Sequence, residues 1–248
     1  MKSFGLTDKG AVRKNNQDCF ILEKCEARGC LIAALCDGMG GAKAGGIASQ
    51  LSNKAFVSYI YMKLMARLPR NADYKRILED ACAEANGVAY EYSHFDEDFD
   101  GMGTTIVGGV IKNNGNGHII NVGDSRAYLI SRRSNSIRQI TRDHSLVGEL
   151  MEAGAITPEQ ARSHPRKNVI TRALGSEAQV KCDYFNFSLQ GGDILLLCSD
   201  GLSNIVSDLE MLEYAREFPE PEELCRSLMS KALNRGARDN VTIVAVMR

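Results

Sequence analysis

Residues 31–41 read LIAALCDGMGG, an aliphatic run that ends in aspartate followed at once by glycine. The same arrangement returns at residues 194–202, which read ILLLCSDGL. Short aliphatic runs bounded by glycine are typical of buried strands. A carboxylate at the end of such a strand is held rigidly, and the glycine after it lets the backbone turn and approach a ligand. Both stretches therefore predict a strand that delivers a carboxylate, from Asp37 or Asp200, to a site.

Three further aspartates stand at expected strand edges. Asp124 follows the expected strand 118–122, Asp239 stands just before the expected last strand 241–247, and Asp18 precedes a further short strand. Clustered carboxylates would repel one another unless cations neutralised them. Carboxylate and carbonyl oxygens favour magnesium, manganese or calcium over zinc or copper. Two such cations bridged by one carboxylate could activate a water and clamp a phosphoryl oxygen, which is hydrolytic phosphate chemistry.

The alternative is that these aspartates serve only as turn formers. Asp-Gly pairs are ordinary turn residues, and each one taken singly is more often a turn than a ligand. Spacing along the chain does not prove that five carboxylates meet in space. From the residues alone, both interpretations stay open.

The remaining pattern predicts an α+β protein with mainly antiparallel sheets, because hairpins outnumber strand-helix-strand units. No internal repeat or low-complexity linker interrupts the chain, which favours one domain. Residues 145–172 should form a short helix and then a polar loop, a flap. The other expected elements are strands at 29–36, 104–111, 118–122, 126–131, 180–187, 194–198 and 241–247, a hairpin turn at 112–117, and helices at 48–66, 74–92, 208–218 and 222–234, the first two separated by Pro69 and Asn71.

Composition excludes several classes of protein. With 44% hydrophobic and 25% charged residues the chain matches soluble folded proteins, so a packed core is expected. The net charge is −1 and the sequence contains no long basic run. The charge pattern therefore does not indicate a surface that binds nucleic acid or a charged membrane. The longest aliphatic stretches fall short of the roughly 20 residues that span a bilayer, so we expect a cytoplasmic protein. Its 8 cysteines contain no C-x-x-C pair and should be reduced, mostly buried thiols.

Short motifs in a fixed order then make a specific resemblance. They are GAVR (10–13) with NQD (16–18), CDGMGG (36–41), GMGTT (101–105), NVGDSR (121–126), TRDHS (141–145), TRALG (171–175), SDGL (199–202) and RDNVT (238–242). This series resembles that of the metal-dependent protein phosphatases, type 2C, over nearly the whole chain. The resemblance implies a four-layer α-β-β-α sandwich with two central, mainly antiparallel sheets. It also implies a single catalytic domain over residues 1–248, with a flap subdomain at about 145–172 beside the cleft.

The resemblance further implies a centre of two Mn²⁺ or Mg²⁺ ions. Asp37 would bridge the two ions, and the carbonyl of Gly38 would ligate one of them. Asp200 and Asp239 would complete the shell of the other. Asp18 would hold water molecules that are bound to the ions.

Outside this core, Asp124 matches a position that helps to bind a third, weaker ion in bacterial relatives. Arg13 matches an arginine that grips the substrate phosphate, a task suited to the guanidinium fork. Two residues depart from the pattern of eukaryotic relatives. Met39 stands where they carry a histidine proposed as general acid, and Gln17 where many carry glutamate. Methionine cannot donate a proton, so the general acid stays unassigned.

The implied function is a serine/threonine phosphatase in which a water between the two ions attacks phosphorus directly. Its partners would be phosphoproteins, with a bacterial serine/threonine kinase as the activity that it reverses, and we expect a monomer. An aspartate-nucleophile phosphatase would need a second acid at Met39, and no cysteine has the arginine six positions later that a cysteine-nucleophile phosphatase requires. A non-catalytic phosphoprotein-binding module would be expected to lack one of Asp37, Asp200 and Asp239, and all three are present.

Overall fold

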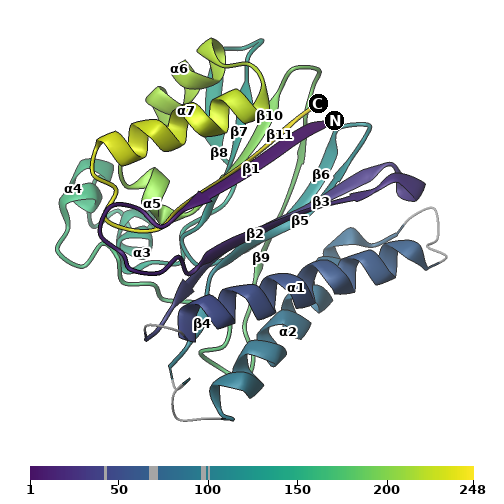
Figure 1. The fold of residues 1–248 in the computed structure, drawn as a ribbon, viewed down its shortest axis with the longest axis vertical. Helices are drawn as coiled ribbons and strands as arrows, with labels where there is room; N and C mark the ends of the chain where they lie inside the picture. Colours follow the sequence, from purple (N-terminus) through teal and green to yellow (C-terminus); the bar gives the residue numbers. More distant parts are fainter. Residues whose placement is uncertain (42–43, 67–71, 96–98, 100) are drawn as a thin grey trace.

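Two antiparallel sheets form the centre of the computed structural model, which describes residues 1–41, 44–66, 72–95, 99 and 101–248 (Figure 1). The five-stranded sheet has the order β1 (Lys2–Asp8), β11 (Val241–Met247), β10 (Ile194–Cys198), β7 (Arg126–Ser131) and β8 (Ser136–Gln139). The six-stranded sheet has the order β2 (Asp18–Cys25), β3 (Cys30–Met39), β5 (Ile106–Lys112), β6 (Asn116–Val122) and β9 (Asp183–Ser188), and β4 (Gly103–Thr104) pairs with the end of β3.

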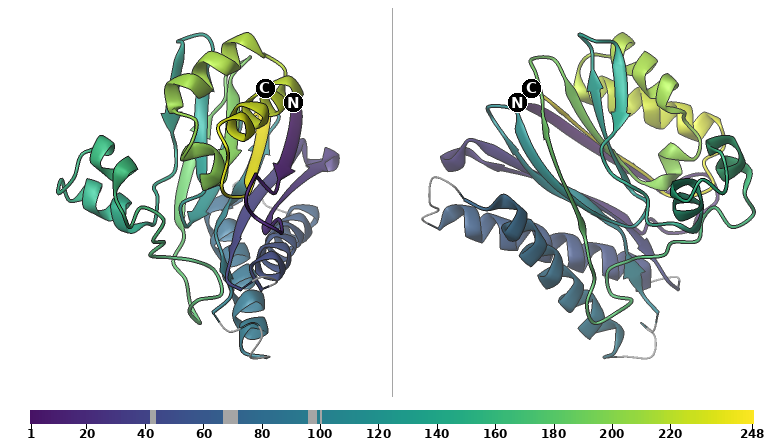
Figure 2. Two further views of the ribbon diagram at one scale, coloured as in Figure 1. Left: turned by 60° about the vertical axis from the view of Figure 1, so that its left-hand side comes forward. Right: turned by 180° about the vertical axis from the view of Figure 1, so that it is seen from behind.

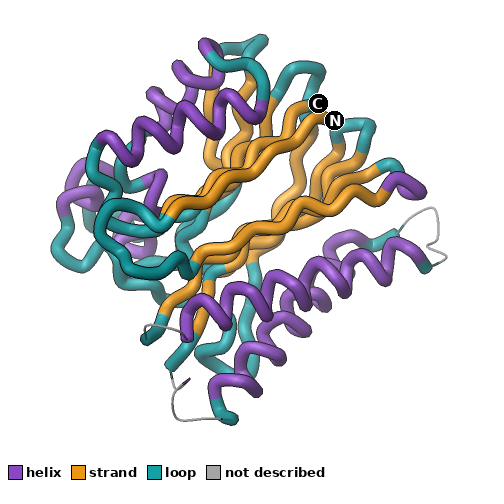
Figure 3. The backbone as a smooth tube through the Cα atoms, viewed as in Figure 1, coloured by secondary structure: helices purple, strands orange, loops and turns teal. Residues whose placement is uncertain are grey.

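Helices cover the outer face of each sheet, which gives four layers (Figures 1 and 3). The six-stranded sheet is covered by α1 (Ala44–Met65) and α2 (Tyr74–Ser93), and the five-stranded sheet by α6 (Asp208–Glu217) and α7 (Pro221–Asn234). The short elements are η1 (Glu26–Arg28), α3 (Leu146–Glu152), α4 (Pro158–Ser163) and α5 (Asp200–Ser203). The expected α-β-β-α sandwich is confirmed.

The unbroken aliphatic run of β3 follows from its position between two hydrophobic layers. Side chains alternate between the faces of a strand. Ile32 and Ala34 therefore pack toward the helices in one cluster, while Ala33 and Leu35 pack between the two sheets in another. Both faces of β3 are buried, so no polar alternation is present in its sequence.

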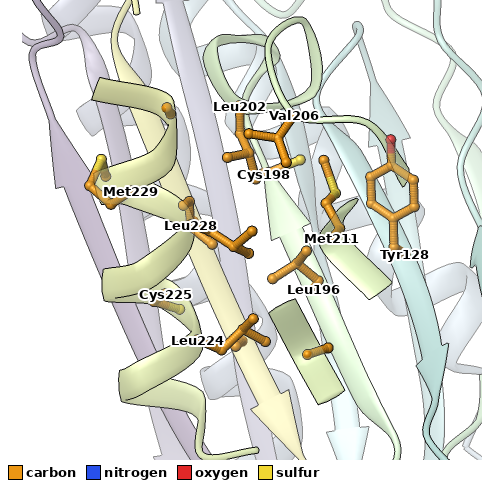
Figure 4. Packing of buried hydrophobic residues seen from close by; sticks show 14 of the residues in the cluster. Tyr128, Leu196, Cys198, Leu202, Val206, Met211, Leu224, Cys225, Leu228 and Met229 are labelled. Atoms are coloured by element: carbon orange, nitrogen blue, oxygen red, sulfur yellow. The ribbon is translucent and has the colours of Figure 1, made fainter. Parts of the chain in front are cut away.

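The strand β10, in the five-stranded sheet, also lies between two hydrophobic layers. Leu195 and Leu197 face the neighbouring sheet. Leu196 and Cys198 face α6 and α7, where they meet Met211 and a row of α7 side chains (Figure 4). The two strands that end near Asp37 and Asp200 are thus packed against hydrophobic layers on both faces.

Most of the expected elements are confirmed, with shifted boundaries. The strand expected at 29–36 continues to Met39, the one at 104–111 divides into β4 and β5, and the one at 180–187 begins later, at Asp183. Outside residues 145–172, four elements were not expected, namely β1, η1, β8 and α5. Pro69 and Asn71, expected to separate the first two helices, lie outside the described residues.

Residues 145–172 contain two helices where one was expected. After α3, Thr157 caps α4 in a capping box with Gln160, and Pro158 occupies the first turn. The two helices stand at the edge of the sandwich (Figure 2). Within the described ranges, no helix has both the length and the apolar character needed to cross a membrane.

Candidate metal centre

Asp37 occupies the end of β3 and is held there by its backbone. Its N–H donates to Thr105 Oγ1 at 3.0 Å. Its carbonyl accepts from Thr104 Oγ1 and from the Thr105 N–H, both at 2.9 Å. Thr104 and Thr105 are fully buried, so this clamp fixes where the Asp37 carboxylate points. The sequence identified both threonines as part of a motif but assigned them no role.

Asp18 lies directly opposite Asp37 in the pairing of β2 with β3. Its Oδ2 atom accepts from Ser199 Oγ at 2.8 Å and from Thr242 Oγ1 at 2.7 Å, two residues of the other half of the sandwich. Its Oδ1 atom has no hydrogen-bond partner among the described residues. Burial raises the pKa of Asp18 to about 6. The carboxylate therefore ties the two sheets together and keeps one oxygen unused.

Asp200 and Asp124 approach from the five-stranded sheet and from the turn after β6. Burial, and then the charge of Asp239, raise the pKa of Asp200 to about 6. Burial, and then the charge of Asp200, raise the pKa of Asp124 to about 8. The Oδ1 atom of Asp124 also lacks a partner within the described part of the chain. His144 holds this turn, because its Nδ1 accepts from the Gly123 N–H at 3.1 Å.

All of these charges act on the carboxylate of Asp37. Its pKa is raised well above the ordinary value, first by burial and then by Asp18, Asp200, Asp124 and Asp239 in that order. The five aspartates singled out in the sequence are therefore brought into one cluster. The interpretation of these residues as isolated turns does not fit this arrangement.

Gly38 is required by close packing against the start of α1. A Cβ atom there would lie 2.0 Å from the carbonyl oxygen of Gly45 and 2.7 Å from that of Gln17. Its N–H donates to the Gln17 carbonyl at 3.1 Å. The close contacts on both sides therefore leave no room for a side chain at position 38.

Arg13 lies at the mouth of the cluster and pairs with Asp239. Its Nη2 donates to Asp239 Oδ2 at 2.7 Å, with 54% of the arginine side chain exposed. Asn240 docks the loop that carries Arg13, since its side chain donates to the carbonyls of Lys9 and Asn15 and accepts from the Gln17 N–H. Asn240 was visible only as part of a motif, and its positioning role appears in the structure.

The donor set fits divalent cations. The carboxylates of Asp18, Asp37, Asp124 and Asp200 have raised pKa values, and Asp18 and Asp124 each have an oxygen that lacks a partner among the described residues. Carboxylate oxygens are the ligands of hard cations. Over the same described ranges, no three Asp, Glu, His or Cys side chains form a ready group around a single point.

A cavity of about 380 Å³ opens beside the cluster. Asp124 and Asp200 line one end of it, and α3 contributes Val147 and Met151. Ser207, at the start of α6, lines another side. Met39, at the end of β3, lines a separate hollow with residues 170–173. The segment 145–163 thus faces the carboxylates across an open space.

Comparison with known proteins decides the family. The family model described as protein phosphatase 2C matches residues 10–236. The chain belongs to this family. It is therefore a protein phosphatase, an enzyme that hydrolyses phosphoric monoesters on proteins, and membership carries a requirement for divalent cations.

Individual relatives agree over almost the full length of the chain. The serine/threonine phosphatase stp of Listeria monocytogenes is 38% identical over 98% of this chain and 94% of its own. The structure of Stp1 from Staphylococcus aureus superposes with a TM-score of 0.90 at 34% identity, covering 99% of this chain and 94% of that one. The catalytic domain of PstP in complex with 2 manganese ions gives a TM-score of 0.82 at 34% identity, with 98% and 96% covered. The expected fold and enzyme class are confirmed.

Proposed function

We propose that this protein is a serine/threonine phosphatase that works with two Mn²⁺ or Mg²⁺ ions at the aspartate cluster. One observation carries the proposal, namely that the charges of the other four aspartates all act on Asp37. A buried cluster of this kind needs cations to balance it at neutral pH. The names of the relatives from Listeria and Staphylococcus, both serine/threonine phosphatases, support phosphoserine and phosphothreonine in proteins as the substrates.

The residues divide the task by their positions. Asp37, Asp200 and Asp239 would hold the two ions through their carboxylates, and Gly38 would do so through its carbonyl oxygen. Asp18 would orient water at this site through its Oδ1 atom, which has no hydrogen-bond partner in the described part of the chain. Bound there, the ions would lower the pKa of a water for attack on phosphorus and neutralise the charge of the phosphoryl oxygens. Asp124 would contribute to a third, weaker ion.

Arg13 would exchange its pairing with the Asp239 carboxylate for a contact with the substrate phosphate. In the structure its guanidinium neutralises Asp239. With Asp239 engaged as a metal ligand, the Arg13 guanidinium would be available to grip the substrate phosphate through two parallel hydrogen bonds. The loop held by Asn240 supplies the right position, because it places Arg13 at the exposed edge of the cluster.

Among the described residues beside the cluster, no side chain is suited to act as a general acid. Met39 has no proton to donate. His144 is occupied, with Nδ1 on the Gly123 N–H and Nε2 near Arg172 and Asp183. Desolvation lowers its pKa, so it is neutral at pH 7. We assign His144 to holding the turn of Asp124, and leave protonation of the leaving group to solvent.

Residues 145–172 would act as a flap that selects substrates within a single catalytic domain. The support is the cavity between α3 and the pair Asp124 and Asp200. A peptide that presents its phosphate to Arg13 would place neighbouring residues in or near this space. We further propose that the enzyme acts as a monomer in the cytoplasm and reverses a bacterial serine/threonine kinase. Its 8 unpaired thiols favour a reducing compartment.

Phosphate release from a phosphothreonine peptide, measured with Mn²⁺, Mg²⁺ or a chelator, tests the proposal. We expect activity only with a cation, and a loss of at least roughly 100-fold in Asp239→Asn, because several kcal/mol of charge stabilisation depend on the ions. Calorimetry should count two strong Mn²⁺ sites in the wild type and fewer in the variant. Asp193→Asn, which changes a buried aspartate at the far end of β10, is the matched control. Turnover in chelator equal to that with Mn²⁺ would disprove the metal centre.

A further inference from the structure

The cavity of about 380 Å³ beside the aspartate cluster is lined from two parts of the chain. One is the segment 145–167, which contributes Met151 of α3 and Lys167. The other runs from α5 to the start of α6 and contributes Ile205 and Asp208. The helices α3 and α5 lie at the same edge of the sandwich (Figures 1 and 2). A peptide bound at the cluster would therefore have a partly apolar and partly charged recess beside it.

Two carboxylates that line the cavity are neutralised by cations of the chain itself. Asp143 accepts three hydrogen bonds from Arg126, the shortest at 2.6 Å. Glu210 is paired with Arg235 at 2.6 Å and with Lys231 at 3.0 Å. Neither carboxylate therefore carries a charge that is available to a ligand.

The carboxylate of Asp208 lacks such a partner. It lines the cavity, is half-buried, and forms no hydrogen bond or ion pair with any residue that the structure describes. Asp124 and Asp200 line the cavity as well, but the ions at the cluster would neutralise them. Among the described carboxylates of the cavity, Asp208 is thus the one that keeps its charge when the ions are bound.

We propose that this cavity selects phosphoproteins with an arginine or lysine near the phosphorylated residue, and that Asp208 binds this positive charge. The inference rests on the proposed function and names the class of its substrates. A basic side chain has a long apolar stem and a cationic head. The stem would pack against Met151 and Ile205, and the head would pair with Asp208. A cavity of this size, at the lower end of the roughly 300–1,000 Å³ of ligand sites, takes a side chain of this length.

Lys167 brings a positive charge to the same cavity. Its ammonium group likewise forms no hydrogen bond or ion pair within the described ranges, so it does not neutralise Asp208. The long stem of lysine lets the ammonium group turn toward solvent, whereas the short side chain of Asp208 stays where the first turn of α6 places it. A cationic ligand can therefore displace Lys167, but an anionic ligand cannot avoid Asp208. This difference favours a basic side chain over an acidic one.

Phosphothreonine peptides of equal length, each with arginine, alanine or glutamate at one position beside the phosphothreonine, test the inference on the full-length, Mn²⁺-loaded protein. For the wild type, kcat/KM should be about 2–5-fold higher with arginine than with alanine at one or two positions, mainly through KM, as for a partly exposed ion pair. The ratio between the two peptides cancels any general change in activity. Added salt should reduce this ratio toward one.

Substitutions of the two charged residues should change the ratio in opposite directions. Asp208→Asn should abolish the preference for arginine, and Lys167→Ala should increase it, because Lys167 repels the same side chain. An acid in the first turn of α6 also suits the helix dipole, so Asp208→Asn can lower stability slightly. Glu223→Gln, at an exposed acid in the first turn of α7, is the matched control. Its melting temperature should fall by a similar amount, but it should keep the wild-type preference.

Four results would overturn the inference. A wild type that hydrolyses the arginine, alanine and glutamate peptides equally at every position would refute the selection and leave the phosphatase function intact. A preference for arginine that persists in Asp208→Asn would remove Asp208 from this role. A preference for glutamate that is lost in Lys167→Ala would assign the cavity to acidic side chains. Failure to hydrolyse any of the peptides would overturn the proposed function, and the inference with it.

Discussion

We expect Asp124→Asn to stabilise the metal-free protein at neutral pH. The Asp124 carboxylate is 8% exposed, and its Oδ1 atom has no hydrogen-bond partner among the described residues. Burial and the charge of Asp200 raise its pKa from 3.8 to about 8. A carboxyl group whose pKa is raised by folding contributes stability that is fully present below pH 3.8 and is lost as the pH rises through 8. At pH 7 the folded protein must therefore take up a proton at Asp124, and this opposes folding.

The magnitude follows from the size of this shift. At pH 7 the cost is on the order of 4 kcal/mol, since about three pH units separate the unfolded pKa from pH 7 and each is worth about 1.4 kcal/mol. Part of the shift comes from Asp200, whose own protonation relieves some of it. A gain of roughly 2–4 kcal/mol remains for the uncharged amide. For a chain of this length the melting temperature should rise by on the order of 10 °C.

Thermal unfolding in chelator, followed by circular dichroism from about pH 4 to pH 8, measures this gain. The difference between the proteins should vanish near pH 4 and shrink when Mn²⁺ is added, because a cation stabilises the ionised carboxylate of the wild type. Asp193→Asn is again the control, since Asp193 is 3% exposed and has an Oδ1 without a partner in the same described ranges, but lies away from the cluster. An Asp124→Asn protein that melts at or below the wild-type temperature at pH 7 would refute the electrostatic reasoning.

Three further substitutions examine the backbone and the loop around the cluster. Gly38→Ala should destabilise the protein by more than about 3 kcal/mol, because its Cβ would lie 2.0 Å from a carbonyl oxygen. Urea unfolding measures this cost against Gly41→Ala, whose Cβ would meet no atom of the described residues within 4 Å; equal stabilities would contradict the close packing. Asn240→Ala should lower kcat/KM for a phosphothreonine peptide by about 10–100-fold through the loss of roughly 1–3 kcal/mol of hydrogen bonding. An unchanged kcat/KM would mean that the loop keeps its place without Asn240. Arg13→Lys should raise KM for the peptide and leave Mn²⁺ affinity near the wild-type value, because an ammonium group lacks the bidentate fork. Calorimetry that found Mn²⁺ binding lost would instead assign Arg13 to the metal shell.

The parts of the fold that the sequence predicts well are those buried on both faces. The run at residues 194–198 gives the bounds of β10 correctly, because two hydrophobic layers require an aliphatic residue at every position. At the sheet edges this requirement relaxes. The strand β8 reads SIRQ and alternates exposed with half-buried residues, so only its pairing with β7 makes it a strand. Strand propensity depends on such neighbours more than on the residue itself.

The sequence predicted which residues belong to the site, but not the contacts that hold these residues in place. Motif order singled out Asp37, but no spacing rule states that Asp18 lies opposite it in the strand register. The clamp of Thr104 and Thr105 likewise depends on β4 folding back onto the end of β3. By contrast, α4 could have been found, since the capping box at Thr157 is a local signal.

The position of Asp18 couples ion binding to the packing of the two sheets. Asp18 belongs to the six-stranded sheet, yet both hydroxyl groups that hold its Oδ2 atom come from the other half, Ser199 after β10 and Thr242 in β11. Thr242 is itself in hydrogen-bonding contact with Thr7 of β1 at 2.7 Å. A displacement of one sheet against the other would therefore move Asp18 relative to Asp200 and break these bonds together. The metal-free cluster can keep its geometry because the sandwich holds it, and a cation that joins Asp37 to Asp200 would in turn join the two sheets.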